Sequence, residues 1–228
     1  MKQATSAPRM SDFAQPTDFL LVSLAFFLVV GLWHALAAGF FYGYFHGWRP
    51  EHWQSRKINQ KPPLPRQYRE EIGWSLLTSF IFGLFGALTA LGWQMGYLRV
   101  YTSLSPPDFY YAPFSLLLAL FIQECYCYWM HRAMHHPRIY RIVHHNSYIT
   151  SPWAFFSFHP PESVLQALVF PAILLVLPMH PAVMVAFLSV MTFTSAVNHL
   201  GIEIYPVSFE RHWLRRYVPQ PAPPAVPL

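Results

Sequence analysis

Five histidines lie within fifteen positions, in the stretch HRAMHHPRIYRIVHH that runs from residue 131 to residue 145. Neutral imidazole is a good ligand for iron, zinc and copper. His131 and His135 are spaced i, i+4, so on a helix they share one face with Cβ atoms roughly 5–6 Å apart. Five imidazoles at this spacing, directly after an apolar run, indicate a metal site rather than surface histidines at the lipid headgroups. Histidine alone does not choose among the metals.

The rest of this stretch provides further candidate ligands. Pro137 disfavours helical backbone at the residue before it, so the chain should turn at His136. The segment after the turn then carries a pair of histidines back toward the end of the helix. The candidates from this part are His136, His144 and His145.

Two later motifs contribute one candidate each. His159 lies in SPWAFFSFHPPE, and a structural role is nearly as well supported for it as a ligand role. His199 lies in NHLGIE, where Asn198 and Glu203 are polar neighbours. The apolar run before it should return the chain to the membrane face of the first stretch, so we expect His199 to join the same site. The other histidines are isolated, and we interpret them as ordinary membrane-interface residues: His34, His46, His52, His180 and His212.

A carboxylate inside the apolar run before the histidines is a second kind of candidate. Glu124 lies seven residues, about two helical turns, before His131. A charged group at that depth in a membrane is costly, which makes it a candidate functional residue. It can accept the second ring N–H of a ligand histidine; the alternative is a structural hydrogen bond between helices. The candidates for such a supporting role are Glu124, Glu162, Asn198 and Glu203.

Composition and hydropathy predict that membrane helices position these residues. The chain is 54% hydrophobic and 11% charged, whereas soluble domains are roughly 25% charged. Three apolar runs, residues 19–45, 72–98 and 110–130, reach the ~20 residues that cross a bilayer. A fourth apolar region, residues 164–197, is interrupted by PMHP and predicts either two helices or a hairpin that enters the membrane part-way. The predicted fold is an all-α integral membrane protein with about four transmembrane or half-spanning helices.

The basic residues predict the orientation of these helices. Residues 49–71 contain six Lys and Arg, whereas the loop after the second apolar run has only Arg99. The positive-inside rule places residues 49–71, and with them the histidine cluster, on the cytoplasmic side. The net charge of +5 is spread in short clusters between apolar runs. This pattern is typical of membrane-surface charge, so we expect no nucleic-acid partner.

The chain divides into three parts by composition. We expect a polar N-terminal segment (1–17), a membrane-embedded domain (18–217) and a Pro-rich disordered tail (218–228). The first apolar run is too long for the apolar region of a cleavable signal peptide, so we expect none. The two cysteines lie within one apolar run and form no disulfide framework.

Three motifs occur in order along the chain: ECYCYWMHRAMHHPRIYRIVHH, SPWAFFSFHPPE and NHLGIEIYP. They resemble the fatty acid hydroxylase / sterol desaturase superfamily of integral-membrane di-iron enzymes, and the resemblance covers roughly residues 70–217. It implies a cytoplasm-facing site whose two irons activate O₂ to hydroxylate or desaturate a fatty acyl or sterol-like lipid from the bilayer. The first histidine box implies His131 and His135 as ligands, and the second box implies His144 and His145. The NHxGxE-like stretch implies His199.

The resemblance also implies an electron donor and a location. The chain shows no flavin, nicotinamide or haem fingerprint, so electrons must come from a separate cytoplasmic protein, cytochrome b5-like or ferredoxin-like. The implied location is the endoplasmic reticulum membrane if the protein is eukaryotic and the inner membrane if it is bacterial.

The sequence departs from the family pattern in two places. The second box usually reads HxxHH, and Arg141 stands where its first histidine would be. A last HxxHH box is expected after RHWLRRYV, where this chain reads PQPAPPAVPL. The ligand set is thus short by about three or four histidines, and we expect fewer than two bound irons and poor turnover.

Two other functions compete with the enzyme. The first is a metal-poor relative that binds a lipid or a partner without turnover, which the missing boxes favour. The second is a transporter that uses Glu124 and the histidines as a proton relay. The histidines gather at one face rather than along a path across the membrane, which disfavours transport.

Overall fold

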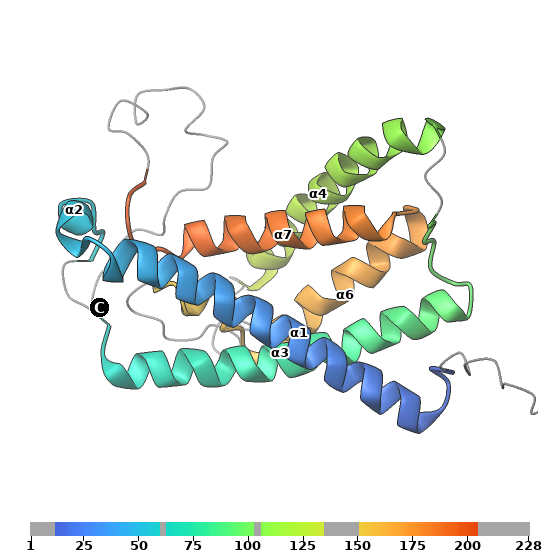
Figure 1. Ribbon diagram of the computed structural model, residues 1–228, viewed down its shortest axis with the longest axis horizontal. Helices are drawn as coiled ribbons and strands as arrows, with labels where there is room; N and C mark the ends of the chain where they lie inside the picture. The colour runs from blue at the N-terminus through green and yellow to red at the C-terminus, as the bar shows by residue number, and fades with distance from the viewer. Residues whose placement is uncertain (1–11, 60–62, 103–105, 135–150, 205–228) are drawn as a thin grey trace, which may run out of the picture.

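The computed structural model describes residues 12–59, 63–102, 106–134 and 151–204 of the chain (Figure 1). Every regular element within these residues is a helix, so the predicted all-α class is confirmed. In chain order the elements are α1 (Pro16–Tyr42), the π-helix η1 (Gly43–Gly47), α2 (Pro50–Gln54), α3 (Pro65–Gln94), α4 (Pro106–Met134), the 3₁₀ helix η2 (Ala154–Phe156), α6 (Pro160–Val176) and α7 (Pro181–Asn198).

Three helices in the described part of the chain are long and apolar enough to cross a membrane: α1 together with η1, α3 and α7. The interrupted fourth region forms two helices, of which α6 is apolar but shorter. The predicted third apolar run lies within α4, which falls outside the group of three because Gln123, Glu124 and several tyrosines interrupt its apolar sequence. The protein is therefore an all-α membrane protein with both spanning and shorter helices.

Proline fixes where the helices begin. The proline ring presets the helical φ angle, and the missing N–H has no partner to lose in the first turn. Helices α1, α2, α3, α4, α6 and α7 all have proline as their first residue. Hydropathy predicts that the second apolar run becomes helical near Ile72, after a polar loop that ends at Glu71. The helix instead starts at Pro65, so Glu71 lies inside α3 and is buried.

Small residues let α1 and α3 pack closely where the two helices cross (Figure 1). A Cβ atom added at Gly83 of α3 would lie 2.9 Å from the backbone oxygen of Ser23 and 2.9 Å from the backbone nitrogen of Phe27. Ser23 is buried, and its hydroxyl donates to the Phe19 carbonyl at 2.8 Å. Such close approach of two backbones is typical of helix pairs in membranes.

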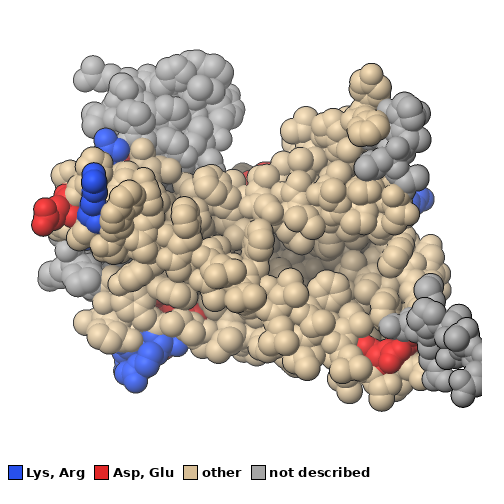
Figure 2. All heavy atoms as spheres, viewed as in Figure 1, with Lys and Arg blue, Asp and Glu red and all other residues tan. Residues whose placement is uncertain are grey.

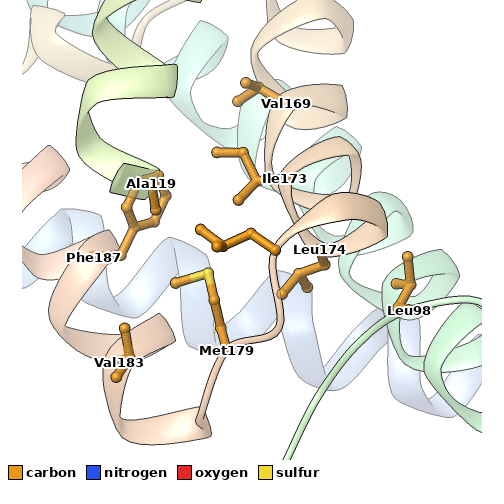
Figure 3. Packing of buried hydrophobic residues seen from close by; sticks show 9 residues of the cluster. Leu98, Ala119, Val169, Ile173, Leu174, Met179, Val183 and Phe187 are labelled. Carbon is orange, nitrogen blue, oxygen red and sulfur yellow. The ribbon is translucent and has the colours of Figure 1, made fainter. Parts of the chain in front are cut away.

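A hydrophobic core lies where α4, α6 and α7 meet (Figure 3). Leu174 and Met179 are completely buried, and Phe187 of α7 is 2% exposed. The Arg99 N–H donates to the Leu174 carbonyl at 2.9 Å, and the Met179 N–H donates to the Arg99 carbonyl at 3.0 Å. The segment after α3 is thereby joined to the turn between α6 and α7.

Charged residues lie mainly at the two ends of the helix bundle. The end of α1, α2, the start of α3 and the end of α7 share one end of the molecule, and the α6–α7 turn lies at the other (Figure 1). On the face in Figure 2, Lys and Arg atoms lie almost only at these ends, and the surface between them is nearly uncharged. This arrangement suits a membrane around the middle of the bundle. The first end carries Arg49, Arg56, Lys57, Arg66 and Arg69.

Candidate metal site

His199 is the C-cap residue of α7, and its side chain is half-buried. Its Nδ1 lies 2.9 Å from the backbone oxygen of Ser195. A carbonyl accepts only from a protonated ring nitrogen, so Nε2 keeps its lone pair for a ligand. Burial lowers the pKa of His199, and the hydrogen bond to Ser195 opposes that shift. Beside it, the Oδ1 atom of Asn198 is buried and has no hydrogen-bond partner within the described residues.

The residues after His199 are tied to the loop between α2 and α3. The Ile58 N–H donates to the Gly201 carbonyl at 3.0 Å, and the Glu203 N–H donates to the Arg56 carbonyl at 2.8 Å. Gly201 has a φ of +66°, a conformation that favours glycine. The NHLGIE motif is therefore fixed against the basic end of the bundle.

His159 is the N-cap residue of α6, and its ring is tilted against Trp74 of α3 with centroids 5.5 Å apart. The His159 Nδ1 is buried and has no hydrogen-bond partner among the described residues. The Glu162 carboxylate accepts from the His159 backbone N–H, and burial raises the pKa of Glu162 to about 7. A glutamate at the third helical position that bonds back to the N-cap N–H is half of a capping box, so Glu162 holds the start of α6 in place.

His131 and Glu124 lie on α4 with their side chains exposed. Together with Tyr128 and Arg132 they line a shallow open hollow. Glu124 and His131 therefore lie on the same face of α4, as their seven-residue spacing predicts. Arg132 donates to the Tyr128 hydroxyl at 3.2 Å.

Four predicted ligands lie outside the described residues: His135, His136, His144 and His145. Among the residues that the structure describes, no group of three or more His, Cys, Asp or Glu side chains is arranged to hold a metal. His199 presents a free Nε2 lone pair, and His159 has a buried ring nitrogen without a partner. The described donors fit an iron site in their chemistry, and they supply only part of its ligand shell.

Sequence reasoning missed two features of this region. It places Glu71 at the end of a polar loop, whereas Glu71 is a buried carboxylate, 3% exposed, that contacts the segment before His159. It interprets His34 as a membrane-interface residue. In the structure His34 lies well within the length of α1, and its ring stacks on that of Phe156 with centroids 3.3 Å apart. The i, i+4, i+8 spacing of Gln67, Glu71 and Ser75 was the available signal that Glu71 belongs to a helix.

The fatty acid hydroxylase family model matches residues 116–222, a range that contains all three histidine motifs. This match and the curated relatives make the chain similar to the fatty acid hydroxylase and sterol desaturase superfamily. It is 29% identical over 172 residues to the Delta(7)-sterol 5(6)-desaturase ERG3B of Gibberella zeae, a match that covers 73% of this chain and 51% of that protein.

Other proteins that this chain resembles are also sterol enzymes by name. The Delta(7)-sterol 5(6)-desaturase erg3C of Aspergillus fumigatus is 26% identical over 186 residues, which cover 73% of this chain and 58% of that protein. Lathosterol oxidase of Homo sapiens is 32% identical over 95 residues, which cover 39% of this chain and 31% of that protein. The chain spans about half the length of the first two of these relatives. No solved structure matches it.

Proposed function

We propose that this chain is the iron-binding membrane domain of an oxidoreductase that uses O₂ to hydroxylate or desaturate a lipid. The observation that carries the proposal is the geometry of His199. This histidine lies within the family match, at the end of a helix long enough to span a membrane, and its Nδ1 is occupied by the Ser195 carbonyl. A histidine fixed in this way presents Nε2 to a metal.

The substrate class is a sterol-like lipid, with a fatty acyl lipid as the broader possibility. The relatives named above are sterol desaturases and a lathosterol oxidase. A membrane-embedded site receives such a substrate directly from the bilayer. Large apolar side chains are exposed along the described helices, among them Leu28, Leu117 and Phe193, which suits contact with lipid.

The proposed ligands are His131, His135, His144, His145 and His199, with His136 and His159 as further candidates. Glu124, Glu162, Asn198 and Glu203 are proposed to support them. When bound, iron supplies the activation of O₂ and the oxidation of an unactivated C–H bond. Apolar side chains near His199 exclude water from this chemistry: Phe155, Phe156, Leu200 and Ile202 are buried in one cluster at the end of α7.

The overall reaction requires an external reductant. Hydroxylation converts C–H to C–OH and releases one water, whereas desaturation removes two hydrogens and releases two waters. Either reaction consumes one O₂, two protons and two electrons, which we assign to a separate cytochrome b5-like or ferredoxin-like donor. The donor is proposed to meet the protein on the cytoplasmic side, at the basic end of the bundle.

The test is iron binding by the full chain in lipid nanodiscs, loaded with Fe²⁺ under anaerobic conditions. His199→Ala should bind much less iron than the parent, because it removes a ligand. The control is His180→Asn at the opposite end of α7. His180 accepts from the Ala182 N–H at 3.1 Å as an N-cap, and asparagine keeps that capping role. Equal iron in the parent and His199→Ala would contradict the proposal.

The alternative function is a metal-poor relative that binds a lipid or a partner without turnover. The observation that favours it is Arg141. This arginine stands at the position where the second histidine box of the family, HxxHH, has its first histidine. A folded parent that binds no Fe²⁺ and does not oxidise a sterol with O₂ and reductant would select this alternative. Iron together with O₂-dependent product would select the oxidoreductase.

A further inference from the structure

One face of α3 carries a row of polar side chains: Gln67, Glu71, Ser75 and Thr78. Each lies three or four residues, about one helical turn, after the one before it, which places all four on a common face. We call these four residues the α3 polar stripe. Thr78 is completely buried and Glu71 is 3% exposed, so the stripe faces the interior of the protein and not lipid. Polar groups in such a position require partners.

The partners of the stripe lie in order along residues 151–163. The Ser151 hydroxyl donates to the Glu71 carboxylate at 2.5 Å, and the Ser75 hydroxyl donates to the Trp153 carbonyl through a longer contact of 3.5 Å. The Thr78 hydroxyl lies 2.9 Å from that of Ser163 in the first turn of α6. The stripe therefore follows this part of the chain from the first residue described after the histidine stretch to the start of α6.

Glu71 makes the strongest of these contacts. Its second carboxylate oxygen accepts from the Gln67 side-chain amide at 2.8 Å. The Ser151 hydroxyl that donates to Glu71 also accepts the Trp153 N–H at 3.2 Å. A carboxylate offers two acceptor oxygens, and both are used here, one by Gln67 and one by Ser151. The buried carboxylate thus holds the start of this segment more firmly than a hydroxyl would.

The same segment is held on its other side by α7. The Ser195 hydroxyl donates to the Phe155 carbonyl at 3.1 Å, and the Ser195 carbonyl accepts from the His199 ring. Phe156 is wedged between His34 of α1 and Phe82 of α3, with ring centroids 3.3 Å and 5.0 Å away. At its carboxyl end the segment continues directly into His159.

We propose that Glu71 is a positioning residue for the metal site, an inference that rests on the proposed function. Through Ser151 it fixes residues 151–158, and this segment sets where His159 lies and supports the α7 turn that orients His199. The effect of Glu71 on metal binding passes through the backbone between Ser151 and His159.

The test uses the full chain in nanodiscs and two readouts. The first is Fe²⁺ affinity from anaerobic titration, and the second is hydrogen exchange of the amides in residues 151–158 without metal. The variants are Glu71→Leu, Glu71→Gln and Ser151→Ala. The control is Thr89→Val, because the Thr89 hydroxyl on the same helix donates only to the Phe85 carbonyl of its own helix, at 2.7 Å.

Glu71→Leu should weaken Fe²⁺ binding about 10–100-fold, the usual loss for residues that orient ligands. It should also speed exchange in residues 151–158. Ser151→Ala should act in the same direction and is the variant to use if Glu71→Leu does not fold. Glu71→Gln should recover much of the affinity, because an amide oxygen still accepts from Ser151. Thr89→Val should change neither readout.

Three results would overturn the inference. The first is an unchanged Fe²⁺ affinity in Glu71→Leu and Ser151→Ala while the parent binds iron. The second is an equal loss in Thr89→Val, and the third is unchanged exchange in residues 151–158. A parent that binds no Fe²⁺ at all would overturn the proposed function instead, so the two failures are distinguishable.

Discussion

At the residue scale, one hydrogen bond decides which nitrogen of His199 remains for a ligand. The Ser195 carbonyl occupies Nδ1, so the ring orientation is set by the last turn of α7 before any metal binds. Orientation of this kind reduces the conformational entropy lost on binding. His159 is held differently, because its backbone is the N-cap of α6 while its Nδ1 has no hydrogen-bond partner among the described residues.

Glu162 provides a prediction at this scale. Its carboxylate caps the backbone N–H of His159, so Glu162→Ala should destabilise the protein by ~0.5–2 kcal/mol through loss of the cap. Glu162→Gln should retain most of the stability, because glutamine also serves in capping boxes. Thermal unfolding followed by circular dichroism in detergent measures both. Similar losses in the two variants would contradict a capping role.

Sequence alone could identify His199 as a candidate ligand, and it could not predict the contacts of Glu71. His199 lies in a short motif at the end of an apolar run, and both the motif and the run can be recognised from the sequence. The role of Glu71 depends on Ser151, which is 80 residues away. Periodicity within one helix reports which residues share a face, and it does not report which distant segment that face contacts.

At the element scale, the contact between α1 and α3 is set by the absence of a side chain at Gly83. Any larger residue there meets the backbone of α1 rather than a movable side chain. Gly73 on the same helix has open space around it, because a Cβ atom added there would meet nothing within 4 Å. The two glycines therefore differ in their packing, although they share a helix and a residue type.

Gly83→Val should destabilise the protein by at least ~1–3 kcal/mol, the usual cost of overpacking. Gly73→Ala should be neutral or stabilising by up to ~1 kcal/mol, because alanine is the better helix former. The thermal midpoint of each variant in detergent gives the comparison. A Gly83→Val protein as stable as the parent would show that α1 and α3 do not approach each other this closely.

The helix boundaries show a similar limit of sequence analysis. Hydropathy predicted the apolar centres of α1, α3 and α7 correctly, because those runs contain few polar residues. It placed the start of α3 about two turns too late, since Arg66, Arg69 and Glu70 resemble a polar loop. Pro65 was the better marker, because proline is favoured at the first helical position.

At the scale of the whole molecule, charge separates the two ends of the bundle. Arg49 and Arg56 lie over the Trp48 and Trp53 rings, with guanidinium carbons 5.3 Å and 5.9 Å from the ring centroids. Tryptophan and arginine together are typical of the membrane–water boundary. The opposite end carries Arg99, so the charge difference favours a cytoplasmic location for α2.

Cysteine labelling tests this orientation. Glu51→Cys at the α2 end and Tyr97→Cys at the other end are placed in a background with Cys125→Ser and Cys127→Ser. Both chosen side chains are exposed. In sealed vesicles of known orientation, a membrane-impermeant maleimide should reach Glu51→Cys from the cytoplasmic side and Tyr97→Cys from the opposite side. Labelling of both from one side would contradict the predicted crossing.

The pairing of residues 56–58 with residues 201–203 has a consequence for biosynthesis. The first partner leaves the ribosome about 140 residues before the second, a delay of roughly 7–30 s at ~5–20 residues per second. During that interval α1 and α3 can already be inserted while the loop between them still lacks its partner. His199 lies two residues before that partner, so the backbone that carries it is anchored only after residues 201–203 have been synthesised.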